Sequence, residues 1–252
     1  MKKTFVAIFL SIALGFPILY AGEIRVAVAA NVSYVITDLI KVFKTTHPQI
    51  KVQVILGSSG KLTAQIKYGA PYQIFMSADM KYPQVLYTER LAELEPVVYV
   101  QGSLAILSTK KRNYCAEIFV LKDPNIHKIA IANPKTAPYG IAAKEALENA
   151  KLYEELKKKF VYGESVSQTV AYATTATDIG IVAKSALFSP QMAHFKEAIH
   201  WTDVDEQLYT PIDQGMVILK EGRGNSEVKA FYDFILSDEA KNIFKKFGYK
   251  TT

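Results

Sequence analysis

Four short segments of this sequence combine small residues with hydroxyl or amide side chains, the residue types that hold a small anion by hydrogen bonds. Each segment follows an apolar stretch and precedes a helical pattern, so each is expected at the N-terminus of a helix. Such an end exposes N–H groups without partners, carries the positive end of the helix dipole and attracts anions. The segments are Ala29-Ala30-Asn31-Val32-Ser33, Gly57-Ser58-Ser59-Gly60-Lys61-Leu62, Asn133-Pro134-Lys135-Thr136-Ala137-Pro138-Tyr139-Gly140 and Gly163-Glu164-Ser165-Val166-Ser167.

Each segment offers its own donors. Asn31 suits the N-cap of a helix and brings an amide, Ser58 and Ser59 bring hydroxyls, and Pro138 suits a helix start that leaves the N–H of Tyr139 free. The second segment looks like a phosphate loop, but two residues separate its first glycine from its Gly-Lys pair where the nucleotide motif needs four. We therefore expect a small oxyanion in preference to a nucleotide.

Hydrolysis is the less favoured alternative function. The Gly-x-Ser-x-Gly elbow of serine hydrolases does not occur, and a catalytic serine needs a neighbouring base. The histidines all lie outside the four segments and lack the spacing of metal ligands. We therefore expect neither an enzyme nor a cofactor, nor side chains bound directly to a metal. The histidines in question are His47, His127, His194 and His200.

Composition narrows the remaining classes. The chain has 30 Lys and Arg against 24 Asp and Glu, a formal charge of +6, but the basic residues are scattered and form no reading motif for nucleic acid. Nucleic-acid binding is therefore not expected. The single cysteine, Cys115, rules out an intrachain disulfide and is interpreted as a passive thiol.

The N-terminus has the pattern of an exported protein. Met1-Lys2-Lys3 precedes an uncharged apolar run from Thr4 to Tyr20, and the small residue Ala21 precedes a polar start. This order predicts a signal peptide over residues 1–21, cleaved near Ala21. A membrane anchor is the alternative reading, but Gly15 and Pro17 break the run. Because no cysteine stands at the cleavage site to carry a lipid, the mature protein is expected to be free in the periplasm.

The elements that must position the four segments alternate along the chain. Val- and Ile-rich stretches are followed by helical spacing, which is typical of α/β folds. Helices are expected near residues 35–43, 144–159 and 228–247. Strands are expected at Ile24 to Ala29, Val52 to Leu56, Ile74 to Met76, Leu104 to Leu107, Lys128 to Ala132, Ile179 to Val182 and Gly215 to Leu219.

Two long extended segments, residues 97–107 and 209–219, bracket the middle of the chain. Two such crossings predict two lobes, the first made of residues 22–100 and 209–252 and the second of residues 101–208. The ligand cleft is expected between the lobes, because α/β ligands bind at the carboxyl ends of strands.

Together these features resemble the periplasmic molybdate-binding proteins. The resemblance implies an α/β, two-lobed type II periplasmic binding protein fold, each lobe a mixed, mostly parallel sheet flanked by helices. It also implies molybdate or tungstate as ligand, delivery to the membrane permease of an ABC importer, and a monomer. The motifs that carry it are Val28-Ala29-Ala30, Gly57 to Leu62, Gly69-Ala70-Pro71, Phe75 to Asp79, Gly140 to Leu147, Gly180-Ile181-Val182 and Phe231-Tyr232-Asp233.

The resemblance also implies which residues contact the oxygens of the ligand. They are Asn31, where many relatives have serine, Ser59 through its hydroxyl and N–H, and Tyr139 and Val166 through their N–H groups, with Ala30 and Ser58 as neighbouring candidates. One position departs from the family: many relatives have a tyrosine after Gly-Ile-Val, where this chain has Ala183. The phenol of Tyr139 is the candidate replacement.

The ligand class rests on hydrogen-bond chemistry. Molybdate and tungstate are tetrahedral dianions whose oxygens only accept, so donors alone satisfy them. Phosphate keeps a proton near neutrality and gains from a carboxylate acceptor, and Glu164 is close enough in sequence to supply one. Sulfate has the same charge and shape as molybdate but is smaller. A binding protein of the same fold for another tetrahedral oxyanion, such as sulfate or phosphate, therefore stays an alternative.

Overall fold

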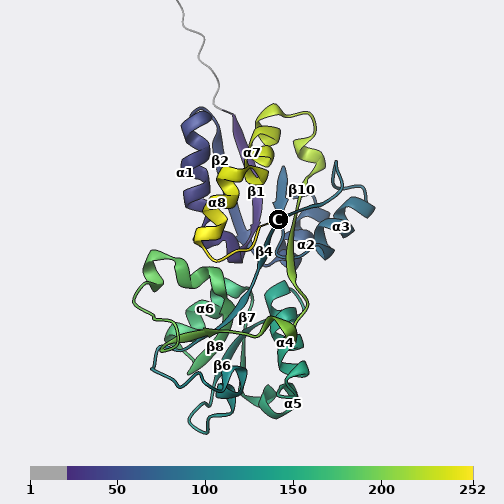
Figure 1. The fold of residues 1–252 in the computed structure, drawn as a ribbon. Helices are drawn as coiled ribbons and strands as arrows, with labels where there is room; N and C mark the ends of the chain where they lie inside the picture. The colour runs from purple at the N-terminus through teal and green to yellow at the C-terminus, as the bar shows by residue number, and fades with distance from the viewer. Residues whose placement is uncertain (1–21, 252) are drawn as a thin grey trace, which may run out of the picture.

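The computed structural model describes residues 22–251 and contains two five-stranded mixed sheets flanked by helices. The α/β, two-lobed fold predicted from the sequence is confirmed (Figure 1). The predicted signal peptide, residues 1–21, lies outside the described residues. Among residues 22–251, none of the helices has the length and apolar character needed to span a bilayer.

The first sheet has the strand order β2-β1-β3-β10-β4, and the second has the order β7-β6-β8-β5-β9. In each sheet two pairings are parallel and two are antiparallel. The first contains β1 (Glu23–Ala29), β2 (Lys51–Gly57), β3 (Ile74–Met76), β4 (Val97–Gly102) and β10 (Ile212–Ile218), and the second contains β5 (Leu104–Leu107), β6 (Ile129–Ala132), β7 (Phe160–Gly163), β8 (Ile179–Ala183) and β9 (Trp201–Asp203).

Each sheet and its helices form one lobe, and the chain passes between the lobes after β4 and again before β10 (Figure 1). The first lobe carries α1 (Ile36–Thr46), α2 (Ser59–Lys67), α3 (Lys81–Thr88), α7 (Ser226–Leu236) and α8 (Asp238–Lys246), and the second carries α4 (Pro138–Asn149), α5 (Tyr153–Leu156) and α6 (Val166–Thr175). Short 3-10 helices are η1 (Ala30–Tyr34), η2 (Glu117–Lys122), η3 (Lys157–Lys159), η4 (Lys184–Phe188), η5 (Pro190–Met192), η6 (Glu206–Leu208) and η7 (Lys220–Gly222).

Apolar spacing explains how the helices cover the sheets. In α1 the buried residues Ile36, Leu39 and Phe43 recur every three or four positions and form one face. The Phe43 ring meets that of Phe231 from α7 edge-on, with ring centroids 5.1 Å apart. This packing fixes α1 beside α7 on the first sheet, and η1 leads from β1 directly into α1.

Two predicted helices are shorter than their spacing indicates. The region 144–159 is divided because Lys151 has a left-handed φ of 58° between α4 and α5, and its last three residues form a 3-10 turn. The region 228–247 is divided at Ser237, which leaves the helical conformation and caps α8 by accepting from the N–H of Ala240.

Candidate functional site

The structure brings all six residues predicted to contact a ligand to the wall of one cavity between the lobes. Its volume is about 10 Å³, far below the several hundred Å³ typical of organic ligands. The six side chains are at most 4 % exposed, so the lobes enclose this space. Its lining is Ala29, Ala30, Asn31, Ser58, Ser59, Ala78, Ala137, Pro138, Tyr139 and Val166.

Helix starts supply backbone donors to this cavity. Ser59 begins α2, Val166 begins α6, and Tyr139 is the second residue of α4, after Pro138. Asn31 lies in the first turn of η1, whose N-cap is Ala29, so the predicted N-cap role of Asn31 is wrong. Among the described residues, the N–H groups of these four have no hydrogen-bond acceptor. Positive ends of helices from both lobes therefore face one small space, an arrangement that favours an anion.

The two serine hydroxyls are placed differently. Ser59 Oγ accepts a hydrogen bond of 2.9 Å from the N–H of Ala78, which fixes the oxygen and leaves the hydroxyl hydrogen to donate. Ser58 Oγ is buried and has no partner in the described part of the chain. Both hydroxyls are therefore able to donate to an oxyanion, with Ser59 the better positioned of the two.

Asn31 takes part in a hydrogen-bond network beneath the cavity. Its Nδ2 donates to Gln214 Oε1 at 2.8 Å and to the hydroxyl of Tyr249 at 3.0 Å. Its Oδ1 has no partner within residues 22–251. Because the amide hydrogens are already used in this network, the donor that Asn31 offers to the cavity is its backbone N–H.

The phenol of Tyr139 joins the same network. Its oxygen accepts a hydrogen bond of 3.0 Å from Gln214 Nε2. Burial raises the pKa of Tyr139 well above its usual value, and the neighbouring phenols of Tyr249 and Tyr99 add to the effect. The phenol therefore keeps its hydrogen throughout the physiological range.

The cavity wall carries no ionised side chain. None of the ten lining residues is an Asp, Glu, Lys, Arg or His. Glu164, the candidate acceptor for a protonated ligand, forms an ion pair of 2.7 Å with Lys61, and both side chains are about half exposed. An anion in the cavity would thus meet neutral donors and no carboxylate.

Hydrogen bonds between the lobes surround the cavity. The N–H of Gly60 donates to the carbonyl of Thr136 at 2.9 Å, and Ser185 Oγ donates to the carbonyl of Asn31 at 3.2 Å. A Cβ at position 60 would lie 2.9 Å from the Thr136 carbonyl oxygen, so glycine permits this approach. Together with the Lys61–Glu164 pair, these contacts hold the lobes closed over the cavity.

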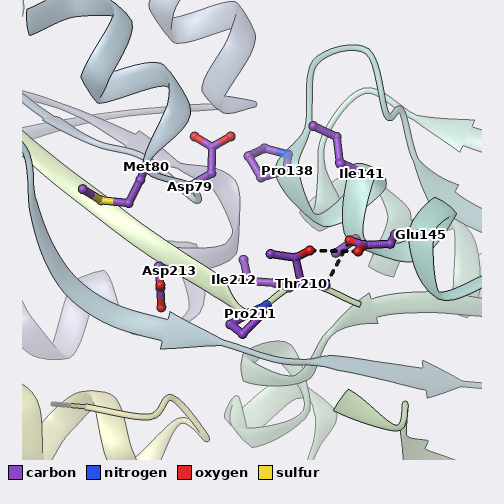
Figure 2. Close-up of a pocket in the computed structure, with 10 residues that line it drawn as sticks. Asp79, Met80, Pro138, Ile141, Glu145, Thr210, Pro211, Ile212 and Asp213 are labelled. Carbon is purple, nitrogen blue, oxygen red and sulfur yellow. Dashed lines mark hydrogen bonds between the residues drawn. The ribbon is translucent and has the colours of Figure 1, made fainter. Parts of the chain in front are cut away.

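A larger groove of about 310 Å³ also lies between the lobes (Figure 2). Its lining includes the carboxylates of Asp79, Glu145 and Asp213. Glu145 is held by the N–H and hydroxyl of Thr210, and burial raises the pKa of Asp79. Carboxylates repel anions, so this groove does not suit the ligand class that the small cavity suits. No cluster of three or more His, Cys, Asp or Glu residues suited to a metal ion occurs within residues 22–251.

Sequence reasoning missed the residues under the cavity. Gln214, Tyr99 and Tyr249 are buried and far apart in the chain, and no motif marks them. Gly102 was also missed. Only the structure shows that a Cβ at this position would lie 2.0 Å from the Tyr139 hydroxyl oxygen. The one available signal was Gln214 itself, a polar residue followed directly by the apolar part of its strand. Ala183, the position that departs from the family pattern, is buried at the end of β8.

Comparison with known proteins shows which family the chain belongs to. Residues 24–250 match the family model described as bacterial extracellular solute-binding protein. The chain belongs to this family. Its relatives include the molybdate-binding protein ModA of Rhodobacter capsulatus, 36 % identical over 92 % of this chain and 89 % of the relative, and that of Azotobacter vinelandii, 34 % identical over 91 % and 90 %.

A solved structure agrees with these relatives. The periplasmic molybdate-binding protein of Azotobacter vinelandii superposes with a TM-score of 0.84 at 30 % identity, covering 91 % of this chain and 100 % of that one. The resemblance inferred from the sequence motifs is therefore confirmed at the level of the family, and the relatives are solute-binding proteins.

Proposed function

We propose that this family member is an extracytoplasmic solute-binding protein that captures molybdate, and also tungstate, and delivers it to an ABC importer. The observation that carries the proposal is the small cavity into which helix starts from both lobes direct N–H groups without acceptors. The names of its relatives, molybdate-binding proteins of Rhodobacter capsulatus and Azotobacter vinelandii, support the choice of ligand.

The donors of the cavity match the chemistry of a tetrahedral dianion. Every oxygen of molybdate accepts hydrogen bonds and none donates, and hydrogen bonds to an ionised acceptor are roughly twice as strong as neutral ones. We assign the contacts to the N–H groups of Asn31, Tyr139 and Val166 and to both the N–H and the hydroxyl of Ser59. Ala30 and Ser58 complete the wall. These residues touch the oxygens, so the metal atom of the ligand has no protein ligand.

Phosphate and sulfate are the main competing oxyanions, and they differ from molybdate in protonation and in bond length. Protonated phosphate gains from a carboxylate acceptor, but no carboxylate lines the cavity, and Glu164 is engaged by Lys61. Sulfate needs no acceptor and differs from molybdate by its shorter bonds, so its exclusion depends on the size of the closed cavity. Sulfate is therefore the critical competitor.

The proposal has further parts. The lobes, residues 22–100 with 209–252 and residues 101–208, close on the ligand as two bodies. The protein carries out no catalysis and acts as a monomer in the periplasm after its signal peptide is removed. Its macromolecular partner is the membrane permease of the importer. The periplasmic relative of Azotobacter vinelandii supports this compartment.

A calorimetric panel on the chain from Gly22 tests the proposal. Sodium molybdate, tungstate, sulfate, phosphate and chromate are titrated separately and then in competition. We expect molybdate and tungstate to bind most tightly and phosphate to bind least. Tighter binding of sulfate than of molybdate would assign the site to the alternative oxyanion, and binding of none of them would overturn the proposal.

A further inference from the structure

We propose that Gln214 is a positioning residue for anion capture, whose amide holds the hydroxyl of Tyr139 so that the phenolic hydrogen points into the cavity. The inference rests on the proposed function and adds a donor to it. It also names the buried amide on which that donor depends, at a position that does not line the cavity.

Both ends of the Gln214 amide are engaged. This residue lies in β10 with no exposed surface. Its Oε1 accepts from Asn31 Nδ2 at 2.8 Å and from the hydroxyl of Tyr99 at 2.9 Å. Its Nε2 donates to the hydroxyl of Tyr139 at 3.0 Å. Because a buried amide is fixed by such a set of partners, Gln214 presents a donor, and not an acceptor, to the phenol.

The direction of this hydrogen-bond chain is set at Asn31. The hydroxyl of Tyr249 gives its one hydrogen to the Asn31 carbonyl oxygen at 2.9 Å, so its oxygen is left to receive Asn31 Nδ2. The second hydrogen of Nδ2 then goes to Gln214 Oε1, and Gln214 Nε2 donates onward to Tyr139. The hydroxyl hydrogen of Tyr139 is the last donor in this series of hydrogen bonds and has no acceptor within it. An anion in the adjacent cavity would accept this hydrogen bond.

The absence of a side chain at Gly102 leaves room for the Tyr139 hydroxyl and the Gln214 amide. A Cβ at residue 102 would lie 2.0 Å from the Tyr139 hydroxyl oxygen and 2.6 Å from Gln214 Nε2. Gly102 ends β4, where the chain leaves the first lobe. The phenol therefore occupies the point of crossing between the lobes, next to the strand that carries Gln214.

The pair also joins the two lobes. Gln214 and Asn31 belong to the first lobe, whereas Tyr139 lies in the first turn of α4 in the second. The hydrogen bond between Gln214 and Tyr139 links the two lobes in this closed structure, and we expect it to break when the lobes open. The Tyr139 hydroxyl is therefore oriented as the lobes close. Loss of this hydroxyl is expected to raise the rate of anion dissociation more than it lowers the rate of association.

A double-mutant cycle tests the inference. Gln214→Met, Tyr139→Phe and the double variant are made in the chain from Gly22, and sodium molybdate affinity is measured by calorimetry and its dissociation by stopped flow. We expect Gln214→Met to weaken binding by about tenfold with tyrosine at position 139, the scale of one charge-assisted hydrogen bond. In the Tyr139→Phe background we expect less than about a twofold further effect, because the hydroxyl is already gone.

Gln65→Met is the matched control. Gln65 accepts a hydrogen bond of 3.0 Å from Tyr72 within the first lobe and does not line the cavity. The Gln65→Met variant should bind molybdate as tightly as the parent chain, although it loses a comparable hydrogen bond. Thermal unfolding of each variant reports stability separately from binding.

The outcomes are distinct. An equal loss from Gln214→Met in both backgrounds, or an unchanged affinity of Tyr139→Phe, would overturn the inference while leaving the proposed function intact. If the parent chain binds no oxyanion, the proposed function fails and the inference fails with it. Should Gln214→Met not fold, Gln214→Asn replaces it in the cycle, because its shorter side chain keeps a polar group in the network but withdraws the donor from Tyr139.

Discussion

Removing the hydroxyl of Ser59 should weaken anion binding, because this hydroxyl is one of the donors assigned to the ligand. Ser59 Oγ is fixed by the N–H of Ala78 at 2.9 Å, and its own hydrogen is left for the ligand. Ser59→Ala therefore deletes one donor to a dianion and unpairs one buried N–H. The neighbouring backbone donor, the N–H at position 59, is retained.

The size of the effect follows from these two losses. A hydrogen bond to a charged partner is worth about 1.5 to about 3 kcal/mol. At about 1.4 kcal/mol for each factor of ten, Kd for molybdate should rise between about 12-fold and about 140-fold. The unpaired N–H of Ala78 adds a separate cost of about 1 to about 3 kcal/mol to the closed state.

Isothermal titration of molybdate into the chain from Gly22 measures the first loss, and thermal unfolding without ligand measures the second. Ser226→Ala is the matched control, because Ser226 is exposed, begins α7 as Ser59 begins α2, and does not line the cavity. Unchanged affinity in Ser59→Ala, with Ser226→Ala also unchanged, would refute the role of the Ser59 hydroxyl.

Three other perturbations probe closure and the buried phenols. Gly60→Ala would place a Cβ 2.9 Å from the Thr136 carbonyl oxygen, so small-angle scattering should show less compaction by molybdate than the parent shows; equal compaction would contradict this. Lys61→Met removes an exposed ion pair worth at most about 1 kcal/mol, so Kd should rise by no more than about fivefold and the difference should shrink in high salt. A larger, salt-independent loss of affinity would contradict the role of the Lys61–Glu164 pair as an exposed contact between the lobes. Burial raises the pKa values of Tyr99, Tyr139 and Tyr249, so their contribution to folding stability is complete below about pH 10 and is lost as pH rises, because the unfolded chain releases these protons first. Urea unfolding at about pH 8 and about pH 11 should give a lower free energy of unfolding at the higher pH, and a rise would contradict the assignment.

Much of the fold was predictable because its strong signals are local. Apolar runs such as those of β1, β3 and β5 are buried on both faces and stand out in the sequence. β4 was predicted only as part of the extended segment 97–107. The strands that were not predicted at all are β7, a four-residue strand at the sheet edge with partly exposed side chains, and β9, which has three residues. Neither is long enough to show an alternating pattern of apolar and polar residues.

The site was predictable in part for a similar reason. The cavity wall consists of residues at helix starts. A helix start is determined by residues that are neighbours in the sequence, as at Ser58 and Ser59 or at Pro138 and Tyr139. The network beneath it depends on pairs such as Asn31 and Gln214, 183 positions apart. Only the folded chain brings these together, so the use of the Asn31 amide within the protein could not be foreseen.

The most direct test of the account is to locate the ion. Crystals grown with molybdate and measured near the molybdenum absorption edge give an anomalous peak at the metal atom. We predict one strong peak enclosed by Ser59, Tyr139 and Val166, with oxygens within hydrogen-bond distance of their N–H groups. A peak in the groove beside Asp79 and Glu145, or a closed cavity without the ion, would contradict the central claim that these neutral donors capture the oxyanion.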